Sequence, residues 1–219
     1  MNGTSRSAMA ELIGTFTLVF IGAGAGALAG TNGGGIVAVA LAHGVALMTI
    51  VYTWGPVSGA HVNPAVTFGL AVGRKISWGK AVVYWIAQFI GAAIASYVLL
   101  FLIGDTGGLG ATTGSLTHSD ALRTMVVEAV LTFFLVSTVL GTAVAGRGGN
   151  AFGLAIGFVL IMDILMGGAL TGASMNPART FGPALATGDL SYLWLYIVGP
   201  CVGGAVASVL SGKVLAEGS

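Results

Sequence analysis

The chain has 219 residues, of which 56% are hydrophobic and only 7% are charged, and its formal net charge is +1. Soluble domains carry roughly 25% charged residues, so this composition indicates an integral protein of a lipid bilayer, with no basic surface for nucleic acid. Cys201 is the only cysteine, and the lack of metal-ligand or nucleophile–base patterns predicts no disulfide, no metal, no cofactor and no enzymatic activity.

Long apolar segments run through the whole chain. They predict six membrane-spanning helices, at residues of about 8–29, 36–57, 81–103, 121–145, 151–170 and 191–215. Short polar or glycine-rich stretches separate these segments, and none of them is polar enough to form a soluble domain. We therefore expect an all-α membrane protein with a single domain over residues 1–219.

The basic residues predict the orientation of these spans. Most of them fall at one set of helix ends, namely Arg6, Arg74, Lys75, Lys80, Arg147 and Lys213. The opposite ends hold three acids and only two basic residues: Asp105, Asp120, Asp189, Arg123 and Arg179. The positive-inside rule then places both termini in the cytoplasm. The short loops are typical of a prokaryotic protein and favour a cell (plasma) membrane.

One short motif occurs twice. Residues 58–69 and 171–182 both contain Gly-Ala, then Asn-Pro-Ala, then Thr-Phe-Gly at matching offsets. Asn63 and Asn176 are good helix N-caps, and the proline after each suits a first helical turn. The apolar stretch that follows is too short to span a bilayer. Because broken backbone at membrane depth must be buried or line a wet cavity, the motif predicts two half-spanning helices beside a water-accessible path.

The two halves of the chain also resemble each other. Each opens with a similar apolar stretch that contains a glutamate, Glu11 in one half and Glu128 in the other. Each half holds three full spans, an odd number, so the repeats at about 8–110 and 120–215 must insert with opposite orientations. The half-helices then enter from opposite sides, and the two asparagines face each other near the midplane.

The paired Asn-Pro-Ala motifs, the two glutamates and Arg179 directly after the second motif resemble the aquaporins, or major intrinsic proteins. The resemblance covers essentially the whole chain. It implies six tilted helices with two re-entrant half-helices, one pore in each protomer, and a homotetramer.

The resemblance also implies the residues of the pore. Its centre corresponds to the paired motifs Asn63, Pro64, Ala65, Asn176, Pro177 and Ala178. A ladder of acceptor carbonyls corresponds to Gly59, Ala60, His61, Val62, Gly172, Ala173, Ser174 and Met175. The outer constriction, or selectivity filter, corresponds to His43, Ile164, Ala173 and Arg179. This filter is most similar to that of the plant vacuolar (tonoplast) branch, which includes water and ammonia conductors.

Other roles are open for several of these residues. His43 could be an ordinary packed histidine, and Arg179 could belong to a structural ion pair. Glu11 and Glu128 would suit a proton relay on general grounds, whereas the resemblance implies that each accepts hydrogen bonds from a re-entrant loop. Asp163, inside the fifth span, could bind a loop, a neighbouring protomer or an ion, and the sequence assigns it no role.

The sequence therefore predicts a passive water channel that excludes protons and ions, with ammonia or another small neutral solute as a candidate second permeant. A glycerol facilitator is the main alternative, but Thr180 stands where such facilitators carry aspartate. A secondary transporter would also fit an inverted repeat with broken helices. A membrane protein with a closed pore is a further alternative, and the vacuolar-type filter leaves an organelle membrane open.

Overall fold

The computed structural model describes residues 3–214, so the ends at 1–2 and 215–219 lie outside it, as do the side chains of Asn32 and Lys213. Within that range the chain is helical and contains no strand. Six long helices are α1 (Gly3–Asn32), α2 (Gly35–Ser58), α4 (Trp78–Ile103), α5 (Ala121–Val139), α6 (Phe152–Thr171) and α8 (Leu195–Val214). Two short helices, α3 (Pro64–Val72) and α7 (Pro177–Thr187), follow the repeated motif. Single turns make up the rest: η1 (Thr106–Gly110), the π-helical η2 (Leu140–Val144) and η3 (Gly149–Ala151).

The long helices have the length that a membrane requires. Five in the described range are long and apolar enough to cross a bilayer, and the sixth, α8, contributes the shorter apolar stretch Leu195–Ser211. The predicted starts differ most for two helices, since α1 already begins at Gly3 and α8 begins only at Leu195. Before α8 the chain forms a turn, in which the Ser191 N–H donates to Asp189 Oδ1 at 3.0 Å.

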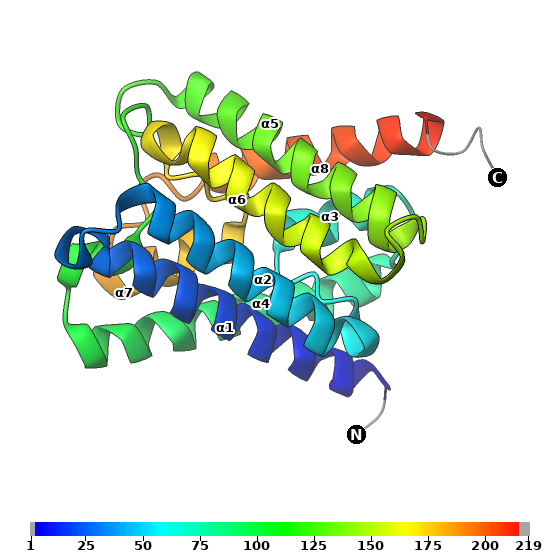
Figure 1. Cartoon of the computed structure of the whole chain (residues 1–219), viewed down its shortest axis with the longest axis horizontal. Helices are drawn as coiled ribbons and strands as arrows, with labels where there is room; N and C mark the ends of the chain where they lie inside the picture. Colours follow the sequence, from blue (N-terminus) through cyan, green and yellow to red (C-terminus); the bar gives the residue numbers. More distant parts are fainter. Residues whose placement is uncertain (1–2, 215–219) are drawn as a thin grey trace.

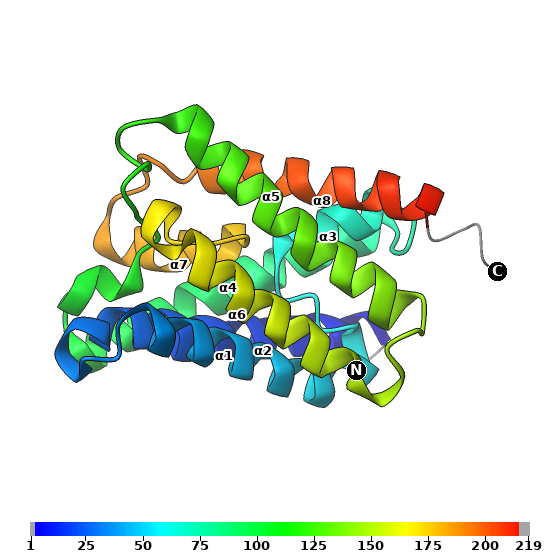
Figure 2. The ribbon, with the colours of Figure 1, turned by 45° about the horizontal axis from the view of Figure 1, so that its top comes forward.

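The helices follow the inverted repeat, with the half-helices exchanged between halves. In the first half α1 packs against α2 and α4, and in the second half α5 packs in the same way against α6 and α8. The half-helix α3 packs mainly on α8, α7 packs mainly on α4, and α2 lies against α6 (Figures 1 and 2). The two half-helices approach the middle of the bundle from opposite ends.

Two equivalent glycines bring the outer helices of each half together. A Cβ on Gly91 of α4 would collide with the carbonyl oxygen of Leu12, and a Cβ on Gly203 of α8 would collide with that of Ala129. The helices therefore pack backbone to backbone at both places, which is the contact that small residues permit in lipid.

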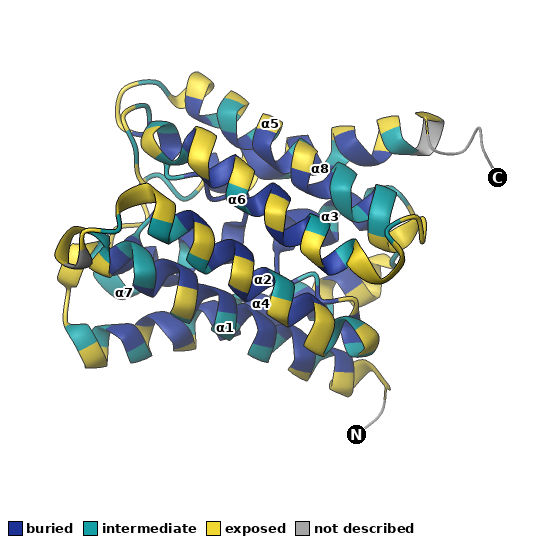
Figure 3. Ribbon diagram, viewed as in Figure 1, coloured by how far each residue is buried: buried dark blue, intermediate teal, exposed yellow. Residues whose placement is uncertain are grey.

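Burial is reversed relative to a soluble protein. Large apolar side chains point outward from every long helix, as the exposed faces in Figure 3 illustrate, and Phe101 is 87% exposed. The interior combines apolar clusters with polar groups, among them Glu11, Gln88, Glu128 and Asp163, each no more than 1% exposed. Long apolar helices whose outward faces carry large apolar side chains are what a lipid solvent requires, so the chain is an integral, multi-pass membrane protein.

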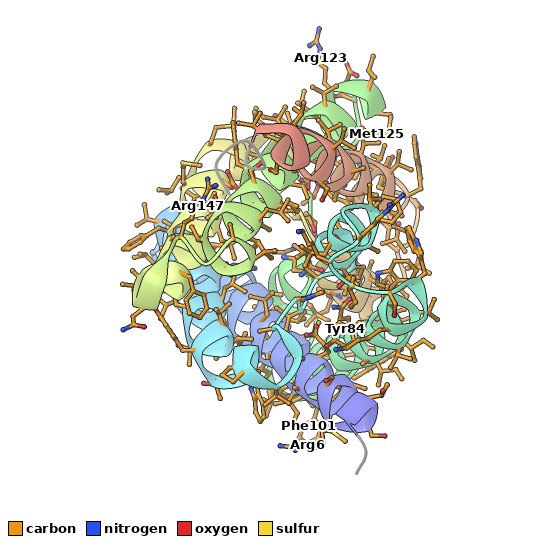
Figure 4. The ribbon with its side chains drawn as sticks, turned by 90° about the vertical axis from the view of Figure 1, so that its right-hand side faces the viewer. Arg6, Tyr84, Phe101, Arg123, Met125 and Arg147 are labelled. Carbon is orange, nitrogen blue, oxygen red and sulfur yellow. The ribbon has the colours of Figure 1, made fainter. Side chains whose placement is uncertain are left out.

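The charged ends agree with the sequence pattern. The bundle end at which α1 begins carries Arg6 and Arg147, and Figure 4 looks onto this end. The opposite end carries Asp120, which caps α5 and forms an ion pair with Arg123 at 3.2 Å.

Candidate functional site

The two half-helices begin with the same cap. Asn63 Oδ1 accepts from the N–H groups of Ala65 and Val66 at 2.8 and 3.3 Å. Asn176 Oδ1 accepts from those of Ala178 and Arg179 at 3.1 and 3.2 Å. Each asparagine has an extended backbone, and Pro64 and Pro177 occupy the first helical turn, where a missing N–H removes no helical hydrogen bond.

Each cap also reaches across to the loop of the other half. Asn63 Nδ2 donates to the Met175 carbonyl at 2.8 Å, and Asn176 Nδ2 donates to the Val62 carbonyl at 2.9 Å. We call this pair of bonds the reciprocal tie. An amide nitrogen carries two hydrogens, so one donor on each asparagine is left for another acceptor.

The loops before the half-helices have an alternating, left-handed backbone. Gly59 and Gly172 end α2 and α6 with φ of 92° and 84°. Beyond them φ is positive at four residues that are not glycine, with values of 43–53° at Ala60, Val62, Ala173 and Met175. Such residues cost on the order of 1–3 kcal/mol each and persist only where the surroundings hold them in place.

Glu11 holds the first loop in that conformation. Its Oε1 accepts from Ser58 Oγ at 2.7 Å and from the His61 N–H at 2.9 Å. Its Oε2 accepts from the Val62 N–H at 2.6 Å and from Gln88 Nε2 at 2.8 Å. Because the loop N–H groups turn toward the carboxylate, the loop carbonyls are available on the other side of the chain.

Glu128 does the same for the second loop. Its Oε1 accepts from Thr171 Oγ1 at 2.7 Å and from the Ser174 N–H at 3.0 Å, and its Oε2 accepts from the Met175 N–H at 2.7 Å. The side chain is completely buried. Both glutamates therefore act as acceptors for loop backbone, and their lone pairs are directed at fixed donors instead of at a chain of proton carriers.

Two tyrosine hydroxyls also hold the loops that Glu11 and Glu128 bind. Tyr84 donates to the Ser58 carbonyl and Tyr196 to the Thr171 carbonyl, each at 2.6 Å. His61 has its ring against the edge of Tyr84, with Nδ1 3.0 Å from Thr67 Oγ1. The imidazole thus anchors the first loop, while the carbonyl side of the loop faces a cavity.

That cavity has a volume of about 390 Å³. Its polar wall combines both loops with both caps and includes Gly59, Ala60, His61, Val62, Asn63, Ser174 and Asn176. Its apolar wall comes from α2, α5 and α6 and includes Leu47, Val51, Leu135, Val139, Ile156 and Leu160. A path with hydrogen-bonding groups on one side and apolar side chains on the other suits small polar molecules in single file.

His43 and Arg179 also line this cavity, and they contact each other. His43 Nδ1 donates to the Val39 carbonyl at 2.9 Å, and His43 Nε2 accepts from Arg179 Nε at 3.3 Å. A guanidinium group can only donate, so these contacts select the neutral imidazole with its proton on Nδ1. Ile164 and Ala173 are buried but are not among the residues that line this cavity.

Arg179 has neutral partners. Its Nη1 donates to Thr112 Oγ1 at 2.6 Å. Thr112 lies in the segment between α4 and α5, residues 104–120, which we call the outer loop. Asp189, the acid nearest to it in sequence, is exposed and accepts from the Ser191 N–H, which lowers the pKa of that carboxyl below its usual value. The sequence singles out Arg179 but not Thr112, because an irregular loop has no periodicity or motif that marks a contact.

Two further residues stand apart from the cavity. Asp163 on α6 is 1% exposed, and neither of its carboxylate oxygens has a hydrogen-bond partner among the described residues. His118 is exposed on the outer loop, with Nε2 3.1 Å from Thr113 Oγ1 and its ring against Tyr192.

Comparison with known proteins agrees with this geometry. Aquaporin TIP1-1 from Zea mays is 44% identical over 218 residues, covering 95% of this chain and 86% of that protein. Aquaporin TIP2-1 from Arabidopsis thaliana is 43% identical over 220 residues, covering 95% and 87%. The X-ray structure of the aquaglyceroporin from Plasmodium falciparum has a TM-score of 0.86 at 26% identity and covers 98% of both chains. The family model described as MIP, Major intrinsic protein, matches residues 2–211, and the chain therefore belongs to that family.

Proposed function

We propose that this protein is a passive transmembrane water channel that excludes protons and ions. The cavity carries the proposal, because it is lined by Asn63 and Asn176, each with one amide hydrogen outside the reciprocal tie, by further residues of both loops and by apolar side chains. The names of the TIP aquaporins that share 43–44% of their residues with this chain support the same assignment.

Exclusion of cations follows from the charges around the path. The N-termini of α3 and α7 each carry roughly +0.5 charge in the macrodipole approximation, and both face the centre. Arg179 adds a full positive charge, and in the described part of the chain no acid lines the cavity. A water that accepts from both asparagines directs its hydrogens away from the centre, which interrupts a proton relay.

The filter residues suggest a second permeant. His43 offers a polar ring and, being smaller than a phenyl group, leaves room beside Arg179 for a small neutral solute. Ammonia is the candidate, since it resembles water in size and hydrogen bonding. The selectivity filter that we propose comprises His43 and Arg179 together with Ile164 and Ala173.

Stopped-flow light scattering on liposomes tests this function. We expect fast osmotic shrinkage, slow glycerol entry and measurable uptake of methylamine, the neutral form of methylammonium. Shrinkage equal to that of empty liposomes would refute the water channel, and faster glycerol than water entry would favour the polyol facilitator. Accumulation against a gradient that depends on protons or Na⁺ would instead identify a coupled transporter.

Assembly and location are further parts of the proposal. Exposed apolar faces on all long helices leave room for contacts between copies as well as with lipid, and we propose a homotetramer with a pore in each protomer. We also propose that the basic end of the bundle faces the cytoplasm of a plasma membrane. Native mass spectrometry tests the tetramer. Labelling of Asn150→Cys against Ser119→Cys, both in a Cys201→Ser background, tests the orientation.

A further inference from the structure

Thr112 lies at the start of a buried chain of hydroxyl groups that ends at the second half-helix. We propose that Thr112 is a positioning residue for Arg179, and that this contact sets the selectivity of the channel. The inference rests on the proposed function, because it concerns the residue that would form the outer constriction.

This chain of hydroxyl groups contains four hydrogen bonds. Arg179 Nη1 donates to Thr112 Oγ1 at 2.6 Å, and Thr112 Oγ1 lies 2.9 Å from Thr180 Oγ1. Thr180 Oγ1 lies 2.5 Å from Ser174 Oγ, which donates to the Asn176 carbonyl at 2.9 Å. All five residues are buried, with exposed fractions of 3–8%.

The two ends of the chain fix its direction. The guanidinium only donates and the Asn176 carbonyl only accepts, and each hydroxyl between them has one hydrogen. Thr112 must therefore donate to Thr180, and Thr180 must donate to Ser174. Hydrogen bonds that all point the same way polarise one another, so removal of one hydroxyl affects the whole chain.

Comparison of the two halves of the protein shows that this chain of hydrogen bonds is specific to the second half. Thr67 occupies the position of Thr180, but its hydroxyl is bonded by Gln88 and His61, both within the first half. In the second half Ser174 replaces the larger His61, and a residue of the outer loop takes part instead. The internal symmetry is therefore broken at the point where Arg179 needs an anchor.

The outer loop is itself held tightly, so Thr112 is a fixed anchor. A Cβ on Gly110 would collide with the Ala23 carbonyl of α1, which shows how closely the loop approaches that helix. On its other side, the N–H groups of Ser115 and Leu116 donate to the carbonyls of Ala169 and Leu170 at 3.1 and 2.9 Å. The hydroxyl of Thr112 is thus fixed relative to both α1 and α6.

The contact with Thr112 is the shorter of the two that orient Arg179. The bond from Nε to His43 measures 3.3 Å, against 2.6 Å for the bond to Thr112. Without the Thr112 hydroxyl, a buried guanidinium keeps one long contact and can rotate toward other acceptors. The opening beside His43 is then less sharply defined, and solutes larger than water pass more easily.

The Thr112→Val and Thr112→Ser variants test this in liposomes. Valine keeps the shape and removes the hydroxyl, while serine keeps the hydroxyl. We expect the ratio of methylamine to water permeability to rise about threefold or more in Thr112→Val, since hydrogen bonds to charged groups are among the stronger ones. The ratio should stay near the wild-type value in Thr112→Ser and in the control Thr106→Val, whose exposed hydroxyl donates to the Ile103 carbonyl at the end of α4. An unchanged ratio in a folded Thr112→Val protein would overturn the inference.

A second measurement does not depend on transport. In nanodiscs with ¹⁵N-labelled arginine, the Arg179 guanidinium signal should show restricted rotation in the wild type and in Thr112→Ser. Rotation should become faster in Thr112→Val and, through the next link, in Thr180→Val. If the wild type failed to conduct water but these signals behaved as described, the function would be wrong and the positioning role would stand. Equal rotation rates in all four proteins would refute the positioning role.

Discussion

At the scale of single residues, Arg179 is a buried cation whose polar partners, His43 and Thr112, are neutral. An uncompensated charge of this kind is costly in a membrane and is retained where it faces a cavity. Its field acts on anything that enters the path, because no acid among the described residues lies in direct contact with it.

Replacement of Arg179 should therefore admit protons. In Arg179→Val, we expect proton flux across liposomes to rise on the order of tenfold, equivalent to about 1.4 kcal/mol of barrier. A pH-sensitive dye inside the liposomes measures it. Arg123→Ala is the control, since that exposed arginine pairs with Asp120 far from the cavity wall. Equal proton flux in the two variants would contradict the role of Arg179.

The carboxylate of Glu128 supports structure instead of carrying protons. Glu128→Gln replaces an oxygen that accepts from loop N–H groups with an amide that donates toward them. Since a buried hydrogen bond to a charge is lost and donors are left facing each other, we expect a loss of about 2–3 kcal/mol of stability. Thermal unfolding in detergent measures it, with the exposed Asp189→Asn as control. A proton relay would predict altered flux in a protein of normal stability.

At the scale of elements, the packing of the outer helices depends on two glycines. In Gly91→Ala or Gly203→Ala, the added methyl group meets a backbone carbonyl that cannot move without shifting the helix. We expect each change to cost about 1–3 kcal/mol by overpacking. Gly79→Ala on the same helix α4 is the matched control, because nothing lies within 4 Å of its Cβ position. Its thermal midpoint should equal or slightly exceed that of the wild type, and a similar loss in all three variants would point to a general effect of alanine.

The half-helices show what the sequence can predict. Their starts at Pro64 and Pro177 follow from the local chemistry of an N-cap and a proline, so the motif was sufficient to place them. Glycine is the residue that adopts a positive φ most readily. Gly59 and Gly172 do have positive φ, but alternate residues beyond them share it. That strain is imposed by distant glutamates, and no local signal reports such a constraint.

The contacts of the outer loop could not be predicted for a related reason. Thr112 lies in a glycine-rich stretch without hydrophobic periodicity, and its partner is 67 residues away in the chain. Its approach to Arg179 depends on how the loop packs against α1 and α6, which is a property of the assembled bundle. The sequence also predicts too early a start for α8, at about residue 191 instead of Leu195. The polar turn at Asp189 extends further into the following apolar stretch than the composition indicates.

At the scale of the whole molecule, the protein has large apolar side chains on its outer surface, and its interior combines apolar clusters with buried polar groups. The outward face of α4 illustrates the pattern, with Ile86, Ile90 and Ile94 each 45–57% exposed. Ile90→Lys puts a charge near the middle of this face, where insertion scales give a cost of about 2.5–3.5 kcal/mol. We expect a large drop in the fraction that resists alkaline extraction from membranes. Thr106→Lys, on the outer loop, should insert normally, and equal insertion of both variants would argue against the lipid-facing assignment.

The reciprocal tie has a consequence for how the protein is made. Val62 and Met175 each receive a donor from the opposite half, so neither loop has its full set of partners until the chain is almost complete. While the second half is synthesised, the first half is already in the bilayer, and Asn63 Nδ2 still lacks its acceptor, the Met175 carbonyl. Closure of the centre is therefore a late step in biogenesis, and quality control that acts on the unfinished protein would encounter an open, hydrated seam between the halves.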